Sequence, residues 1–258
     1  MAQLNIAVRL DSMGLPIKRA LRTASQIGAR FVELDARNSI KPSELSETGL
    51  RQLRKMLDDL NLRVAAVRFQ TRRGYDNPQD LERRVDATKT AMQFAYNLGC
   101  NVVVNQIGLV PDSEEHPGWS AFQQVIHDLG RYGARIGAFL AAETGTESGE
   151  QLAKLLGNAD DAFVAVALNP GQLIINRHSV PDAISALKER IQTISAVDGV
   201  LDLAAGRGIS VPLGQGTADF PQLIGMLEDI QYRGPYIVGR SDSTINELAQ
   251  GVEYLSNL

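Results

Sequence analysis

The sequence predicts an α/β protein and, within that class, a closed (β/α)₈ barrel. Short runs rich in β-branched and apolar residues recur eight times in 258 residues, and each is followed by a longer segment with helical spacing of its apolar residues. Eight such units in about 250 residues match a closed barrel better than an open doubly wound sheet. No linker or low-complexity tract interrupts the pattern, so we expect one domain over residues 1–258.

The expected strands are the apolar runs themselves. They are residues 4–10, 30–35, 63–69, 101–107, 137–143, 163–168, 190–196 and 236–240.

Helices are predicted between these strands. In residues 45–60, Ser46 is placed to cap the N-terminus and leucines recur on one face. Residues 78–98 carry Pro78 in the first turn and are followed by Gly99, as is typical of helix ends. The other expected helices are residues 16–27, 119–135, 147–156, 181–189, 218–230 and 244–255.

Composition restricts the partners and the compartment. The 26 basic and 30 acidic residues give a net charge of −4, which leaves no excess positive charge to bind a nucleic acid backbone. The single cysteine, Cys100, has no partner for a disulfide or a thiolate metal site, and we expect it to be a small buried residue. The N-terminus lacks a signal-like apolar region and no segment reaches the roughly 18 apolar residues of a membrane span. We therefore expect a cytoplasmic protein with neither nucleic acid nor membrane as a partner.

Function in such a barrel is expected at the carboxyl ends of the strands. Polar residues at these ends are Arg9, Asp11, Glu33, Asp35, Arg37, Arg68, Gln70, Arg72, Arg73, Asn105, Gln106, Glu143, Asn169, Ser195, Arg240 and Asp242. Polar strand ends are common to all barrels, so any one of these residues alone indicates a loop or pairing role.

Several common catalytic motifs are missing from the sequence. His116, His127 and His178 are scattered, which argues against a multi-zinc cluster, and no G-x-S-x-G motif or local triad is present. In the segment PLGQGTADF, Gly214 and Gly216 precede a predicted helix. Their N–H groups are placed either to bind an anion or to form a plain turn into the helix, and we favour the turn.

Four stretches together carry a family resemblance: FVELDARNSIKPSEL, LAAETGTESGEQLAKLL, VALNPGQL and VPLGQGTADFPQLIGMLEDIQYRGPYIVGR. With these stretches the whole chain resembles the xylose isomerase-like TIM-barrel family, which includes sugar and sugar-phosphate isomerases and epimerases, and apurinic-site endonucleases. The resemblance implies a small-molecule carbohydrate or sugar phosphate as ligand. The endonuclease branch is excluded because it needs many histidines and a basic DNA-binding face.

The resemblance also implies a degenerate metal site. Sugar-converting members typically hold a divalent metal with Glu, Asp, His and Glu at the fifth to eighth strands. In this sequence Glu143 matches, whereas the other positions are Asn169, Ser195 and Gly239. Three carboxylates and a neutral imidazole around a divalent ion carry a net charge near −1, and Glu143 alone also carries −1. Loss of the metal together with its other ligands would therefore leave the net charge of the site unchanged. One carboxylate with an amide and a hydroxyl does not form a convincing Mn²⁺ or Zn²⁺ site, so we expect no metal and no cofactor.

Two functions stay open on this basis. The favoured one is a protein that has lost metal-dependent activity and binds a small carbohydrate-type ligand. The alternative is a metal-independent isomerase, epimerase or lyase acting on a sugar phosphate or sugar acid, with Glu143 as acid or base. Without a catalytic role, Glu143 is expected to pair with Arg240 or Arg68.

The candidate residues follow from these hypotheses. Glu143 is the catalytic candidate. The candidate ligand-binding residues are Arg9, Asp35, Arg68, Gln106, Asn169, Ser195 and Arg240. Barrels of this family often self-associate, and the sequence leaves a homo-oligomer open.

Overall fold

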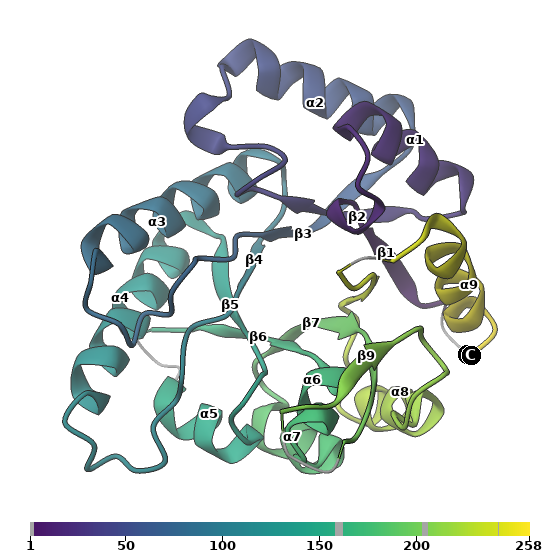
Figure 1. Cartoon of the computed structure of the whole chain (residues 1–258). Helices are drawn as coiled ribbons and strands as arrows, with labels where there is room; N and C mark the ends of the chain where they lie inside the picture. Colours follow the sequence, from purple (N-terminus) through teal and green to yellow (C-terminus); the bar gives the residue numbers. More distant parts are fainter. Residues whose placement is uncertain (1–2, 158–161, 203–205, 242) are drawn as a thin grey trace.

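Eight parallel strands close into a barrel, viewed along its axis in Figure 1. The computed structural model describes residues 3–157, 162–202, 206–241 and 243–258. Around the barrel the strands are ordered β1-β10-β7-β6-β5-β4-β3-β2, and β2 pairs with β1 to close the ring. Their bounds are β1 Asn5–Arg9, β2 Phe31–Asp35, β3 Arg63–Arg68, β4 Val102–Asn105, β5 Phe139–Glu143, β6 Ala165–Leu168, β7 Ile191–Ala196 and β10 Pro235–Val238. All eight predicted strands and the predicted fold class are confirmed.

Helices surround the barrel between consecutive strands, and each predicted helix is present. Their bounds are α1 Ile17–Gln26, α2 Glu47–Asp59, α3 Leu81–Asn97, α4 Trp119–Ile136, α5 Gly149–Leu156, α7 Val180–Leu187, α8 Phe220–Asp229 and α9 Ile245–Ser256. The largest difference is at the start of α3, which begins at Leu81 rather than Pro78 because Asp80 has a positive φ of 53° that is incompatible with a right-handed helix. As predicted, the Ser46 side chain accepts a hydrogen bond from the N–H of Gly49 at the start of α2.

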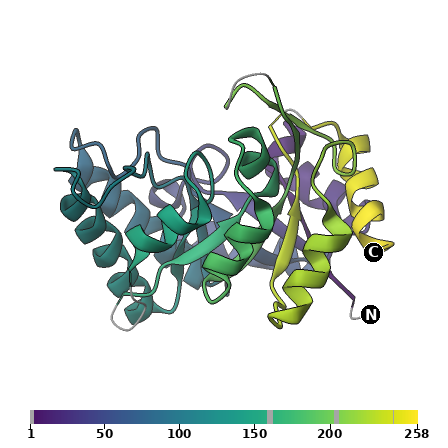
Figure 2. The same cartoon turned by 90° about the horizontal axis from the view of Figure 1, so that it is seen from below.

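Two features near the seventh strand were not predicted from the sequence. A short helix, α6 Pro170–Ile175, begins directly after β6, where the Asn169 side chain accepts a hydrogen bond from the N–H of Gln172. Strands β8 Asp198–Val200 and β9 Ile209–Val211 form an antiparallel hairpin. Figure 2 shows this hairpin projecting from the face of the barrel that also carries the loops after the parallel strands.

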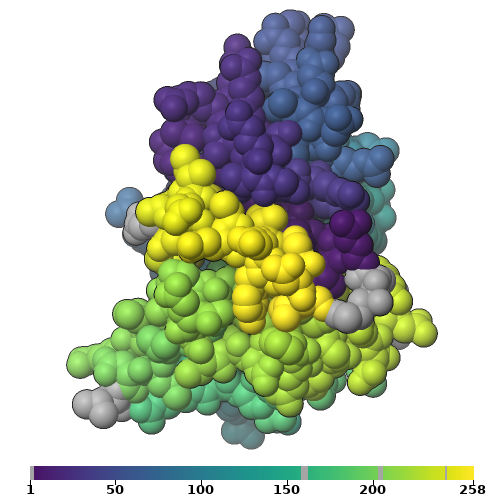
Figure 3. Space-filling model, turned by 90° about the vertical axis from the view of Figure 1, so that its right-hand side faces the viewer, coloured from purple at the N-terminus to yellow at the C-terminus, as the bar shows by residue number. Residues whose placement is uncertain are grey.

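The two ends of the chain lie together in the closed barrel. β1 pairs with β10, and α9 contacts β1; Figure 3 shows the first and last segments side by side. The core consists of apolar strand residues with the inward faces of the helices, including Leu53 and Leu57 of α2, and it contains Cys100 as predicted. Over the described residues, no helix combines the length and the hydropathy that a bilayer crossing requires.

Candidate functional site

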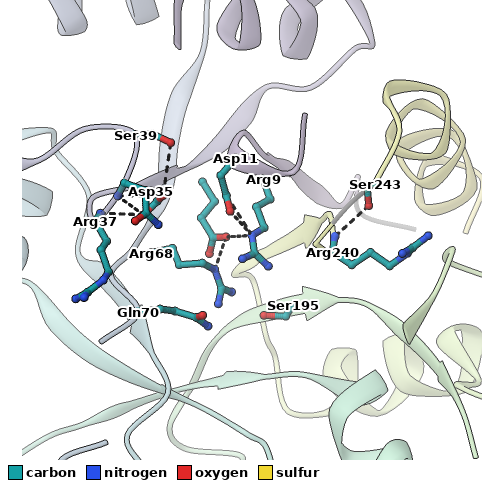
Figure 4. A network of polar contacts seen from close by, with 12 residues as sticks. Arg9, Asp11, Asp35, Arg37, Ser39, Arg68, Gln70, Ser195, Arg240 and Ser243 are labelled. Atoms are coloured by element: carbon teal, nitrogen blue, oxygen red, sulfur yellow. Dashed lines mark hydrogen bonds and ion pairs between the residues drawn. The ribbon is translucent and has the colours of Figure 1, made fainter. Parts of the chain in front are cut away.

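Five charged residues form a chain of ion pairs across the carboxyl-terminal mouth of the barrel. Arg9 Nε lies 3.1 Å from Asp11 Oδ1 and 3.7 Å from Glu33 Oε2. Arg68 Nε lies 2.8 Å from the same Glu33 oxygen, and the other two Arg68 nitrogens donate to Glu143 at 2.8 and 3.0 Å. Arg9, Asp11, Glu33, Arg68 and Glu143 are called the mouth network below. Figure 4 shows Arg9, Asp11 and Arg68 gathered in this region.

The Glu143 carboxylate is surrounded by hydrogen-bond donors. Besides the two bonds from Arg68, it accepts from Ser195 Oγ at 2.9 Å, from Asn169 Nδ2 at 3.2 Å and from Gln70 Nε2 at 3.3 Å. A carboxylate has about four lone-pair sites, so these five bonds use its accepting capacity. Burial raises the pKa of Glu143, but the adjacent Arg68 guanidinium more than offsets burial and lowers that pKa to about 2. Glu143 is therefore an ionised and fully bonded group.

Arg68 is a buried, permanently charged cation. Only 3% of the residue is exposed. Burial lowers its pKa, but the carboxylates of Glu143 and Glu33 raise that pKa well above its ordinary value. The guanidinium geometry suits this bidentate contact with a carboxylate.

Glu33 is the second carboxylate bound to Arg68, and it is completely buried. Its Oε1 atom has no hydrogen-bond partner among the described residues. Burial raises the pKa of Glu33, although Arg68 and Arg9 act in the opposite direction. The sequence places Glu33 at a strand end but predicts no role for it, because a buried carboxylate cannot be distinguished from a surface one without the barrel geometry.

Gly239 follows β10, the eighth strand of the barrel in chain order, and has no room for a side chain. Its φ is +138°, and a Cβ atom there would lie 2.7 Å from Ser12 Oγ and 2.8 Å from Arg9 Cβ. Arg9 thus occupies space that a carboxylate from this position would need to enter.

Within the described parts of the chain, no group of three or more His, Cys, Asp or Glu side chains is placed to hold a metal ion. The accepting capacity of Glu143 is used by Arg68 and its neutral neighbours, and the Ser195 hydroxyl donates to Glu143. His116, His127 and His178 make hydrogen bonds with nearby backbone groups outside the mouth network.

The predicted ligand-binding residues fall into three groups. Arg68, Asn169 and Ser195 meet at Glu143, and Arg9 lies in the same network. Gln106 is exposed on the loop after β4. The remaining two residues, Asp35 and Arg240, are used elsewhere.

Asp35 and Arg240 both stabilise local structure. Asp35 accepts hydrogen bonds from the backbone of Arg37 and Asn38. Arg240 Nη2 lies 3.1 Å from Glu247 Oε1 on α9, and Figure 4 shows its side chain directed away from the labelled mouth residues. Of the two expected partners of Glu143, Arg68 is therefore the correct one and Arg240 is not. Asp242, also noted at this strand end, lies outside the described residues.

The glycine-rich turn before α8 holds an anion from its own chain. The carboxylate of Asp198, which is fully buried, accepts hydrogen bonds from the backbone N–H groups of Gly199, Gly214, Gly216 and Ala218, at 2.8 to 3.2 Å. Because these N–H groups are bonded internally, the segment serves as a turn into the helix, the interpretation that the sequence analysis favoured.

A cleft of about 360 Å³ lies beside the mouth network, between the loops that follow β3, β4 and β5. Its lining includes Thr71, Arg72, Arg73, Gln106, Glu143, Glu147 and Gln172. Glu147 is only 6% exposed and accepts a hydrogen bond from the N–H of Gly145 at 3.2 Å. Burial raises the pKa of Glu147. Arg72, Arg73 and Glu147 were not among the predicted binding residues.

The fold and the site define a (β/α)₈ barrel with a polar, arginine-filled mouth and an adjacent open cleft. Residues 21–258 match the family model described as xylose isomerase-like TIM barrel, and the chain belongs to this family. The family contains sugar isomerases and epimerases. A search of curated proteins gives no significant match.

Solved structures confirm the fold over the whole chain. A xylose isomerase domain protein from Planctomyces limnophilus is 21% identical, with a TM-score of 0.87 over 99% of this chain and 97% of that one. A xylose isomerase-like TIM barrel protein from Mycobacterium smegmatis, in complex with magnesium, is 17% identical, with a TM-score of 0.75 over 100% of this chain and 98% of that one. A D-allulose 3-epimerase from Methylomonas sp., in complex with D-allulose, is 14% identical with the same TM-score and the same coverage.

Proposed function

We propose that this chain binds a small carbohydrate-type ligand and has lost the metal-dependent isomerase chemistry of its family. The observation that carries the proposal is the set of five hydrogen bonds on Glu143, two of them from the buried Arg68. The one carboxylate that matches the family's metal ligands thus binds a guanidinium of the same chain.

Charge supports this interpretation of the mouth network. Its three carboxylates against two guanidiniums leave a net charge of −1 when all five groups are ionised. A divalent ion with three carboxylates and a neutral imidazole also carries −1. The two arginines therefore supply as much positive charge as a divalent metal, but a guanidinium has no open coordination position with which to polarise a substrate oxygen.

The adjacent cleft supports ligand binding. Its volume of about 360 Å³ lies within the usual range for small-molecule sites. Gln106, Glu147 and Gln172 line the cleft with amide and carboxyl groups, which can hydrogen-bond to sugar hydroxyls.

Two measurements test the proposal. Metal analysis of the purified protein, with thermal unfolding in Mn²⁺, Mg²⁺ and EDTA, is expected to show no stoichiometric metal and no appreciable shift in Tm. Titration with sugars, sugar acids and phosphosugars is expected to show binding without turnover. Stoichiometric Mn²⁺ and a strong Mn²⁺-dependent rise in Tm would contradict the proposal.

A metal-independent isomerase, epimerase or lyase is the second candidate function, and Glu147 is the observation that favours it. This carboxyl group lines the cleft and its pKa is raised by burial, as suits a group that accepts and returns a proton, whereas the pKa of Glu143 is lowered. If a ligand is turned over, Glu147→Gln is expected to abolish turnover while binding persists. Turnover that survives Glu147→Gln but not Glu143→Gln, in a folded protein, would return the role to Glu143.

A further inference from the structure

Arg72 and Arg73 are exposed arginines that line the cleft, on the loop after β3. Neither side chain has an ion-pair or hydrogen-bond partner in the described parts of the chain, whereas Arg9, Arg68 and Arg240 are each paired with a carboxylate. The three arginines predicted from the sequence to bind a ligand are thus paired within the protein, and Arg72 and Arg73 remain available to a ligand.

Asn105 holds the loop that carries Arg72 and Arg73 on both sides of the two arginines, at Thr71 and at Tyr75. Asn105 lies at the end of β4 and is fully buried. Its Oδ1 accepts from the N–H of Thr71 at 3.1 Å, and its Nδ2 donates to Tyr75 Oη at 2.8 Å. The Tyr75 ring is 1% exposed, and its hydroxyl also contacts Thr88 Oγ1 at 2.7 Å. The two arginines therefore extend from a backbone segment whose position is set by buried contacts.

The same loop is held against the loop after β4. The N–H of Tyr75 donates to the carbonyl of Ile107 at 2.6 Å. Gly74 and Gly108 approach so closely that a Cβ atom on Gly74 would lie 2.1 Å from Gly108 Cα. This contact fixes the arginine loop relative to Gln106, which lines the same cleft. Ligand binding here requires little ordering of the backbone, which favours affinity.

Charge in the cleft favours an acidic ligand group at the arginine side. The cleft is also lined by three carboxylates. The charge of Glu143 is compensated by Arg68, and Glu147 lies on the loop after β5. Asp76 lies on the arginine loop and forms no ion pair with Arg72 or Arg73 in the described structure, so the cleft lining from this loop, two arginines and one aspartate, keeps a net charge of +1. A guanidinium pairs with carboxylate and phosphate oxygens through directed, charge-assisted hydrogen bonds. We propose that Arg72 and Arg73 form an anion subsite, and that the ligand is a carbohydrate carrying a carboxylate or phosphate group. This inference rests on the proposed carbohydrate-binding function and specifies the chemistry of the ligand.

The test compares acidic and neutral probes on two matched variants. D-gluconate, D-glucose 6-phosphate and neutral D-glucitol are titrated calorimetrically into the wild type, into R72Q/R73Q and into R22Q/R131Q. The control pair removes the same charge from two exposed arginines, on α1 and α4, that form no ion pair with any described residue. Thermal unfolding of all three proteins verifies folding.

The wild type and R22Q/R131Q are expected to bind gluconate or glucose 6-phosphate at least about tenfold more tightly than glucitol, and R72Q/R73Q is expected to lose this preference. The acid that binds more tightly identifies carboxylate or phosphate as the natural group. Equal binding of acidic and neutral probes by all three proteins would overturn the anion subsite but leave carbohydrate binding intact. Absence of binding by every probe would overturn both proposals.

Discussion

Arg68 and Glu143 face one another across the barrel mouth, joined by hydrogen bonds of 2.8 and 3.0 Å between their side chains. Both residues are almost completely buried, and Arg68 also bonds to Glu33 at 2.8 Å. A buried ion pair contributes little net stability compared with well-packed apolar residues, but removal of one member leaves an uncompensated buried charge. The guanidinium of Arg68, on β3, therefore compensates two buried carboxylates, Glu33 on β2 and Glu143 on β5.

Arg68→Met is expected to lower the free energy of unfolding by about 3–5 kcal/mol, because it leaves Glu33 and Glu143 buried without their shared cation. Arg63→Gln in the same strand is the control, since Arg63 is exposed at the start of β3 and its loss is expected to change stability by no more than about 0.5 kcal/mol. Denaturant unfolding of both variants measures the difference. Equal stability of the two variants would show that the pair has no structural role.

Gly239→Ala is expected to destabilise the protein by about 1–3 kcal/mol, because residue 239 has a φ of +138° and a methyl group there meets Ser12 and Arg9. Gly225→Ala is the matched control, at an exposed position of α8 where a Cβ meets no atom within 4 Å. That substitution is expected to stabilise by about 0.5–1 kcal/mol, since alanine favours helix. Thermal unfolding distinguishes the two, and a stabilising effect of Gly239→Ala would contradict the strained, crowded geometry at the end of β10.

The fold was predictable because local patterns determine it. Eight apolar runs alternate with helical spacing, and features such as Ser46 at the start of α2 mark helix ends. The helix α6 and the β8–β9 hairpin were missed because both are short. Their main determinants, Asn169 at the start of α6 and Asp198 beneath the glycine turn, act through contacts that ordinary periodicity does not reveal.

The site was predictable only in part. The positions of Glu143, Asn169 and Ser195 followed from the family resemblance, and the structure brings the three together. Arg68 pairs with Glu143, whereas Arg240 pairs with Glu247 on α9. The direction in which each side chain points depends on the three-dimensional arrangement and cannot be read from the sequence. The same holds for Arg72 and Arg73, which line the cleft and have no ion-pair partner among the described residues, whereas Arg9, Arg68 and Arg240 are paired.

Asp198→Asn is expected to loosen the loop between β7 and α8. An asparagine retains one carbonyl oxygen, so its amide nitrogen faces backbone N–H groups that now donate to the carboxylate. Loss of these charge-assisted bonds is expected to cost about 2–3 kcal/mol of unfolding free energy. Limited proteolysis is also expected to cut faster within residues 206–218. Asp86→Asn, at an exposed position of α3, is the control; identical cleavage rates would exclude Asp198 as the anchor of this loop.

Acid is expected to weaken the mouth network through Glu143. The pKa of Glu143 is lowered to about 2 in the folded protein, so the ionised carboxylate stabilises the fold fully above the ordinary value near 4.5, and that contribution is lost as pH falls from 4.5 toward 2. The pKa difference corresponds to about 3 kcal/mol. Glu33 acts with the opposite sign: its pKa is raised, so its contribution to stability is present at low pH and is lost as pH rises through the folded-state pKa.

Unfolding free energies measured from pH 2 to pH 7 are expected to show the contribution of Glu143. They are expected to fall less steeply below pH 4.5 in Glu143→Gln than in the wild type or in Glu253→Gln, an exposed control on α9. Parallel curves for all three proteins would mean that Glu143 is not held ionised by Arg68.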